Sequence, residues 1–256
     1  MFSVSKETLL TRYQYACQSA LANVNWFKTD KIRTLQAVLH YLVSFPSELL
    51  TSRIDIIPRQ TFLFQQNNYR DASAILGIVA QIARNMGMHR DPSHFPYTPW
   101  VFEIRRRLWN HLCCLDAMAV SFYGAESCLP ATTDSRPPQN ANDRDWHASR
   151  FAKPSSVPSA PGFAEMTFPL VHRAIADVTR FLAATDLHDF EKKDIILREA
   201  ETHINDTLLC DIDRNDPSHS VVAAYAEIRL ASLKLPNLHR REKESHCNPS
   251  DPGRQQ

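Results

Sequence analysis

Two stripes of apolar residues between positions 72 and 123 dominate the pattern of the chain. Both repeat at steps of three and four, the spacing that gathers side chains on one face of an α-helix. The first stripe consists of Ala72, Ile75, Leu76, Val79, Ile82, Ala83 and Met86. The second consists of Ile104, Leu108, Leu112, Leu115, Ala119 and Phe122. We predict two helices with one face in the core, and we expect Arg105, Arg106 and Arg107 to lie largely on the opposite side.

The residues at the ends of these helices support the prediction. Gly87 can take the left-handed conformation that ends a helix, and Met88 can supply the apolar contact that accompanies it. Thr98 offers a capping hydroxyl for the second helix, and Pro99 suits its first position. Gly124 ends it. A continuous helix from Pro99 would be about 37 Å long, enough to cross a whole domain.

Similar stripes predict five further helices, over residues 5–22, 30–45, 166–181, 196–208 and 221–228. Ser5 is suited to cap the first, and Pro46 stops the second. The stretch 47–66 is interpreted as a loop or a broken helix.

Two stretches lack helical periodicity. Residues 127–162 are rich in Pro, Ser, Asn and Asp, which predicts a surface loop that is partly mobile. Residues 236–256 are polar, which predicts a disordered tail. The fold prediction is therefore an all-α, orthogonal or bundle-like domain over residues 1–235, with one long loop.

Composition narrows the functional classes. The chain has 256 residues, of which 43% are apolar, and its formal net charge is +1. A near-neutral chain has no global field that attracts nucleic acid or an anionic membrane. Only 5 glycines against 16 prolines argue against glycine-rich phosphate loops. No apolar run approaches the roughly 20 residues that cross a bilayer, and the N-terminus lacks the apolar middle of a secretory signal. We expect a soluble intracellular protein.

The spacing of the cysteines does not match that of a structural zinc site. They are Cys17, Cys113, Cys114, Cys128, Cys210 and Cys247. Structural zinc sites use ligand pairs two to four residues apart, and no two cysteines have that spacing. Cys113 and Cys114 are adjacent on a helix, where their side chains diverge by about 100°. We expect them to be free thiols in or near the core.

No catalytic motif is complete. His89, Arg90 and Asp91 spell the start of a kinase catalytic loop, but Pro96 stands where that motif needs an asparagine. The nucleophile elbow, the phosphate-binding glycine loop and the His-Glu-x-x-His helix are absent. The acidic residues of Asp143-Arg144-Asp145 are interpreted as solvated charges. We therefore predict no catalytic residue, no cofactor and no metal ligand.

The arginine triplet has two interpretations. The guanidiniums could neutralise DNA phosphates, which a salt-dependent mobility shift would detect. Alternatively they pair with acidic neighbours, cap carbonyls or lie over apolar surface, because three consecutive residues span most of a helical turn. We favour the second interpretation. On the predicted faces, Leu108→Asp should cost several kcal/mol by burying a charge, and Arg106→Ala should cost little.

Several sequence blocks occur in a fixed order. They are Ala83-Arg84-Asn85-Met86-Gly87-Met88-His89-Arg90-Asp91-Pro92, then Glu103-Ile104-Arg105-Arg106-Arg107-Leu108-Trp109, then Leu115-Asp116, then Leu129-Pro130 and the stretch from Asp134 to Asp143. This order resembles the regulatory middle region of fungal binuclear zinc-cluster transcription factors, the fungal-specific transcription factor domain. The resemblance runs from about residue 35 to 181. Its motif residues, with a structural or regulatory role, are Gly87, His89, Arg90, Asp91, Arg105, Arg106, Arg107, Leu108, Trp109, Asp116, Pro130 and Asp134.

The resemblance implies a helical, non-enzymatic domain that controls a transcription factor through intramolecular inhibition, small-molecule sensing or partner contacts. It implies a nuclear location, a role in specialised metabolism, and a full-length zinc-cluster factor or other regulator as partner. The family's DNA-binding module is a cysteine-rich segment N-terminal to this region, and none of the six cysteines matches it. The chain thus resembles a regulatory region without its DNA-binding module. The alternative is a stand-alone helical enzyme or small-molecule-binding protein of biosynthesis.

Overall fold

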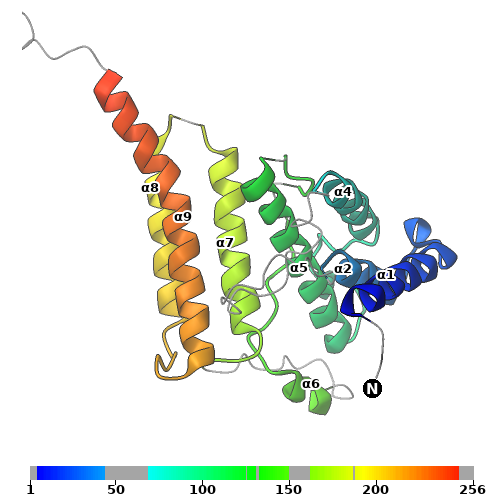
Figure 1. Cartoon of the computed structure of the whole chain (residues 1–256). Coiled ribbons are helices and arrows are strands. Elements are labelled where there is room, and N and C mark those ends of the chain that lie inside the picture. Colours follow the sequence, from blue (N-terminus) through cyan, green and yellow to red (C-terminus); the bar gives the residue numbers. More distant parts are fainter. Residues whose placement is uncertain are drawn as a thin grey trace, which may run out of the picture.

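The computed structural model describes residues 5–43, 69–124, 126–130, 133–149, 162–186 and 188–247. Every regular element within these ranges is a helix (Figure 1), which confirms the all-α prediction. The α-helices are α1 (Lys6–Asn23), α2 (Ile32–Val43), α4 (Tyr69–Asn85), α5 (Pro99–Tyr123), α6 (Asp143–Ser149), α7 (Thr167–Ala184), α8 (Phe190–His203) and α9 (Pro217–Cys247). Short helical turns are η1 (Trp26–Lys28), η2 (Pro92–His94) and η3 (Ile204–Leu208).

Helix α5 runs through the middle of the molecule. Figure 1 shows α1, α2 and α4 on one side of it and α7 on the other, with α8 and α9 beyond α7. The 25 residues of α5 match the predicted helix from Pro99 to Tyr123. Its length lets it contact both halves of the chain.

The apolar core has two main clusters. The first joins α2, α4 and α5, and its buried members include Leu35, Leu39, Leu76, Val79, Trp109 and Leu112. The second joins α7, η3 and α9, and its buried members include Val171, Ile175, Ile204, Val222 and Leu230. Cys114, Ala117 and Ala176 form a small cluster between α5 and α7, where short side chains let the two helices approach closely.

The prediction of one buried face on α5 is wrong for its middle. Every residue from Leu112 to Ala119 is buried, because α7 covers the side opposite the first core. The side of α5 that carries the arginines is also more buried than expected. Arg105 is only 4% exposed, and the side chains of Arg106 and Arg107 are 12% and 21% exposed.

Most of the predicted helix caps are present in the structure. The Ser5 hydroxyl accepts a hydrogen bond from the Thr8 amide at 3.2 Å. Gly124 ends α5 with φ +61°. Thr98 differs from the prediction, because its side chain makes no capping hydrogen bond and only its carbonyl accepts from the Phe102 amide, at 3.0 Å.

Two predicted irregular stretches hold more structure than expected. Part of the loop over 127–162 forms α6, and its described residues are hydrogen-bonded to the helices around them. The tail predicted from Pro236 instead continues α9 as far as Cys247. Leu, Arg, Lys and Glu are good helix formers, so a polar run of this kind can extend a helix that has already begun. The stretches 47–66 and 248–256 lie outside the described residues.

Candidate functional site

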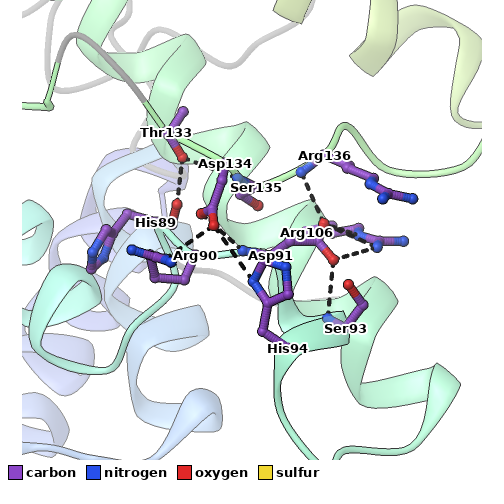
Figure 2. Close-up of polar contacts among 10 residues, drawn as sticks. All are labelled: His89, Arg90, Asp91, Ser93, His94, Arg106, Thr133, Asp134, Ser135 and Arg136. Atoms are coloured by element: carbon purple, nitrogen blue, oxygen red, sulfur yellow. Dashed lines mark hydrogen bonds and ion pairs between the residues drawn. The ribbon is translucent and has the colours of Figure 1, made fainter.

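The motif residues gather where the end of α4 and the first half of α5 meet the segment that leads to α6. We call residues 126–130 and 133–142 the connecting segment. The site is a set of buried carboxylates on the helices that receive hydrogen bonds from this segment. Figure 2 shows its central part.

The corner between α4 and α5 is formed as the sequence predicted. Gly87 has φ +70°, and its amide donates to the Arg84 carbonyl at 2.9 Å. The Met88 amide donates to the Ala83 carbonyl at 3.0 Å, and the Met88 side chain is 1% exposed in the first core. These two bonds and the apolar contact are the Schellman arrangement that ends a helix at a glycine.

Asp91 lies just after this corner and is 2% exposed. Its Oδ1 accepts from Arg106 Nη2 at 2.8 Å and from the Ser93 amide at 3.0 Å. Its Oδ2 accepts from Arg106 Nε at 3.2 Å and from the Arg136 amide at 3.0 Å. Burial alone would raise the pKa of Asp91, but the bonds from Arg106, Ser93 and Arg136 hold it well below its ordinary value. Asp91 is therefore a buried carboxylate that anchors α5 and the connecting segment.

Asp134 holds the same corner from outside. Its Oδ2 lies 3.0 Å from Arg90 Nε and 3.5 Å from His94 Nδ1, and its Oδ1 accepts from the Asp91 amide at 3.1 Å (Figure 2). Thr133 donates its hydroxyl to the His89 carbonyl. These contacts place the connecting segment against the turn after α4.

Glu103 is the second buried carboxylate, at 1% exposure. It accepts from Arg107 Nε at 2.8 Å and from the Gln139 amide at 3.3 Å. Burial raises the pKa of Glu103 above its ordinary value although Arg107 and the Gln139 amide act in the opposite direction. Arg107 also bonds to Asp143 at the start of α6, so it links α5 to α6.

Arg105 contacts a backbone carbonyl and an aromatic ring, whereas Arg106 and Arg107 contact carboxylates. Its Nη2 donates to the Met86 carbonyl at the end of α4, and its guanidinium lies 4.9 Å from the centre of the Tyr97 ring. Burial lowers the pKa of Arg105, and the Tyr97 side chain acts against that shift. The three arginines thus bind a carbonyl, Asp91 and Glu103 within the domain, which favours the interpretation that they pair internally.

Asp116 is the third buried carboxylate, at 1% exposure. It accepts from the Ser127 hydroxyl at 2.6 Å and from the Cys128 amide at 2.8 Å. Arg180 of α7 lies 3.8 Å from Asp116 and donates to the Pro130 carbonyl. Burial and Asp116 raise the pKa of the Cys128 thiol to about 12. This contact ties the start of the connecting segment to both α5 and α7.

Two further motif residues, Trp109 and Leu108, belong to the first apolar core or pack against it. Trp109 is 1% exposed and its ring lies 6.3 Å from that of His89. Leu108 is partly buried and packs against the first core, as predicted for its face. Leu129, next to Pro130, is 6% exposed and enters the same core from the connecting segment.

Sequence reasoning missed several residues that complete the site, among them Glu103, Arg180, Gln139 and Arg136. The i,i+4 spacing of Glu103 and Arg107 on one helix is a signal that could have identified their ion pair. The contact of Arg180 with Asp116 joins two helices and has no such signal. Gln139 and Arg136 contribute backbone amides, for which the side-chain pattern carries no signal.

The arrangement is structural in its chemistry. Each of the three buried carboxylates already accepts from at least two donors. Over the ranges that the structure describes, no three His, Cys, Asp or Glu side chains are placed to share a metal ion. No described helix is long and apolar enough to span a membrane.

Comparison with known proteins identifies the family. The model of the fungal specific transcription factor domain matches residues 7–223. A pyriculol/pyriculariol biosynthesis cluster transcription factor of Pyricularia oryzae is 30% identical over 172 residues, which cover 67% of this chain and 20% of that protein. A C6 finger domain transcription factor of Aspergillus fumigatus is 31% identical over 175 residues, which cover 66% of this chain and 20% of that protein. An aurofusarin cluster transcription factor of Gibberella zeae is 24% identical over 247 residues, or 93% of this chain and 34% of that protein.

The chain spans about a fifth of the length of the first two of these relatives. No solved structure matches it significantly. The family match covers most of the chain, including α1 to α8, the connecting segment and the start of α9. The chain belongs to the family of the fungal specific transcription factor domain.

Proposed function

We propose that this chain is a regulatory domain that controls the transcription of a specialised-metabolite gene cluster. The observation that carries the proposal is the family match over residues 7–223, together with relatives that are named as cluster transcription factors. We further propose that the domain acts in the nucleus and through contact with a DNA-binding regulator.

The site supports action through protein contacts. DNA binding through Arg105, Arg106 and Arg107 would require them to face phosphates, but each holds a partner inside the domain. Reading of DNA bases is therefore assigned to a zinc-cluster module, whether that module is joined to this domain or recruited by it.

The test uses the fungus that encodes the chain. Deleting the gene should lower the transcripts of one biosynthetic cluster, and the wild-type gene should restore them. A fluorescently tagged chain should enter the nucleus and co-purify with a zinc-cluster factor. Arg106→Ala, which breaks the bond to Asp91, should fail to restore the transcripts, whereas Arg144→Ala, at an exposed position on α6, should restore them. Unchanged cluster transcripts together with a strictly cytosolic chain would remove the proposal.

A further inference from the structure

A cavity lies among α7, α8, α9 and the end of α5, and Asp91, Glu103 and Asp116 do not line it. Its volume is about 510 Å³, and its walls come from α5, α7, α8 and α9. Cavities of this size bind small organic molecules in many proteins. Val120, Leu182 and Leu233 supply apolar wall, and none of the three takes part in the site described above.

The cavity carries positive charge. Lys193 of α8 and Arg229 of α9 both line it. Lys193 is only 7% exposed, which is rare for a lysine. In a partly enclosed space of low dielectric, two cationic groups favour an anionic ligand more strongly than they would at the surface.

The cavity also offers hydrogen-bond acceptors. Asn237 lines it and is 7% exposed. Its Nδ2 donates to Asp194 Oδ1 at 2.6 Å, and this bond orients the amide, because a carboxylate only accepts. The opposite atom, Asn237 Oδ1, is buried without a hydrogen-bond partner, an arrangement that costs free energy until a donor arrives.

Pro236 adds to this effect. It lies inside α9 and lines the cavity together with Ser232, four residues earlier. Proline has no amide N–H, so it cannot donate to the Ser232 carbonyl as another residue would. The Ser232 carbonyl therefore lacks the helical donor that position 236 would otherwise supply.

We propose that this cavity binds a small organic acid whose carboxylate lies between Lys193 and Arg229, whose apolar body contacts Leu182 and Leu233, and whose hydroxyl donates to Asn237 Oδ1. The inference goes beyond the proposed function, because binding by the purified chain does not depend on any effect on transcription.

The test is calorimetric titration of the full chain with β-hydroxydecanoate, decanol and decylamine. These probes share an apolar tail and differ in the head group. The acid should bind at least about tenfold more tightly than the alcohol or the amine. Decanoate, which lacks the hydroxyl, should bind more weakly than β-hydroxydecanoate, because it leaves Asn237 Oδ1 without a donor.

Variants locate the binding site. Lys193→Gln and Arg229→Gln should each weaken binding of the acid by about tenfold. Lys192→Gln is the matched control, because the neighbouring lysine is exposed and does not line the cavity. Ser232→Trp should block binding from an exposed position, so it keeps the test decisive if a buried variant fails to fold.

Three outcomes would overturn the proposal: no binding of the acid, equal binding of all three head groups, or unchanged binding of the acid to Lys193→Gln or to Ser232→Trp. Each of these outcomes is independent of the transcript measurements, so the failure of one proposal is distinguishable from the failure of the other.

Discussion

Asp91, Glu103 and Asp116 are each at most 2% exposed, yet all three face donors from a stretch of chain that the sequence predicted to be a mobile loop. A buried carboxylate is tolerable only when it is bonded on several sides. At the scale of single residues, the stability of the domain therefore depends on polar partners as well as on apolar area.

The pair of Asp91 and Arg106 gives a direct prediction. Arg106→Ala leaves Asp91 charged and buried without its guanidinium, and we expect a loss of about 3–5 kcal/mol in the free energy of unfolding. Arg144→Ala is the control, because the Arg144 side chain is 84% exposed and exposed ion pairs contribute at most about 1 kcal/mol. Urea denaturation monitored by circular dichroism measures both. Equal midpoints for the two variants would contradict the role assigned to Asp91.

This prediction replaces the expectation from sequence that Arg106→Ala would cost little. The helical pattern placed Arg106 away from the apolar stripe, which is correct, but that side of α5 faces Asp91 instead of water. The expectation for Leu108→Asp stands, because Leu108 packs against the first core.

His172 makes stability depend on pH. It is 9% exposed, and burial, with His111 and Arg229 acting in the same direction, lowers its pKa to about 4 from the ordinary 6.5. Because the folded pKa is below the unfolded one, protonation favours the unfolded chain. The contribution of His172 to the free energy of unfolding is fully present above the unfolded pKa. It falls as the pH drops from 6.5 towards 4, by about 2–3 kcal/mol in total.

The measurement is urea denaturation at several pH values across this window. His172→Phe, in a site beside Phe168 and Tyr225, should lose part of the slope, because phenylalanine cannot be protonated. Replacing the exposed His239 by Gln should keep the slope. A slope unchanged in His172→Phe would show that other groups cause it.

At the scale of elements, α4 contains one glycine, Gly77, and a second, Gly87, follows its end, and the two have opposite roles. Gly87 has φ +70°, which strains any residue with a Cβ, so Gly87→Ala should destabilise the domain by about 1 kcal/mol. Gly77 lies inside the helix with nothing within 4 Å of an added Cβ, so Gly77→Ala should stabilise by about 0.5–1 kcal/mol. Thermal unfolding should shift the two midpoints in opposite directions. Shifts of the same sign would show that one of the two backbone assignments is wrong.

The helices were predictable because their signals are local. Apolar spacing located α4 and α5, and Gly87 and Gly124 marked where they end. Thr98 was the exception among the caps, because a capping residue type does not ensure that its side chain reaches an amide.

The polar site was not predictable to the same degree, because its contacts join residues far apart in the chain. Asp91 and the Arg136 amide are separated by 45 positions, and Glu103 and the Gln139 amide by 36. The family motifs identified Asp91 and Asp116 as notable, but only the structure shows what bonds to them. The sequence of the connecting segment has no apolar repeat. Backbone amides provide many of its contacts, and these contacts do not require particular side chains.

At the scale of the whole molecule, two cores are joined through the small residues between α5 and α7. Ala176→Leu would overfill this contact and should destabilise the domain by about 1–3 kcal/mol. Ala184→Leu, an exposed position on the same helix, should change stability by less than about 0.5 kcal/mol. Calorimetry of both variants measures the difference. Equal melting temperatures would show that α5 and α7 do not need small residues to pack.

The return of the chain from α5 to α6 also sets a limit on how the protein can be shortened. A fragment that stops after Gly124 would retain α1 to α5 but would leave Asp116 without Ser127, Cys128 and Arg180, and Glu103 without the Gln139 amide. It would also remove Leu129 from the first core. A stable fragment should therefore contain the first helices together with everything up to α7, because hydrogen bonds and ion pairs connect the two cores across α5 and α7.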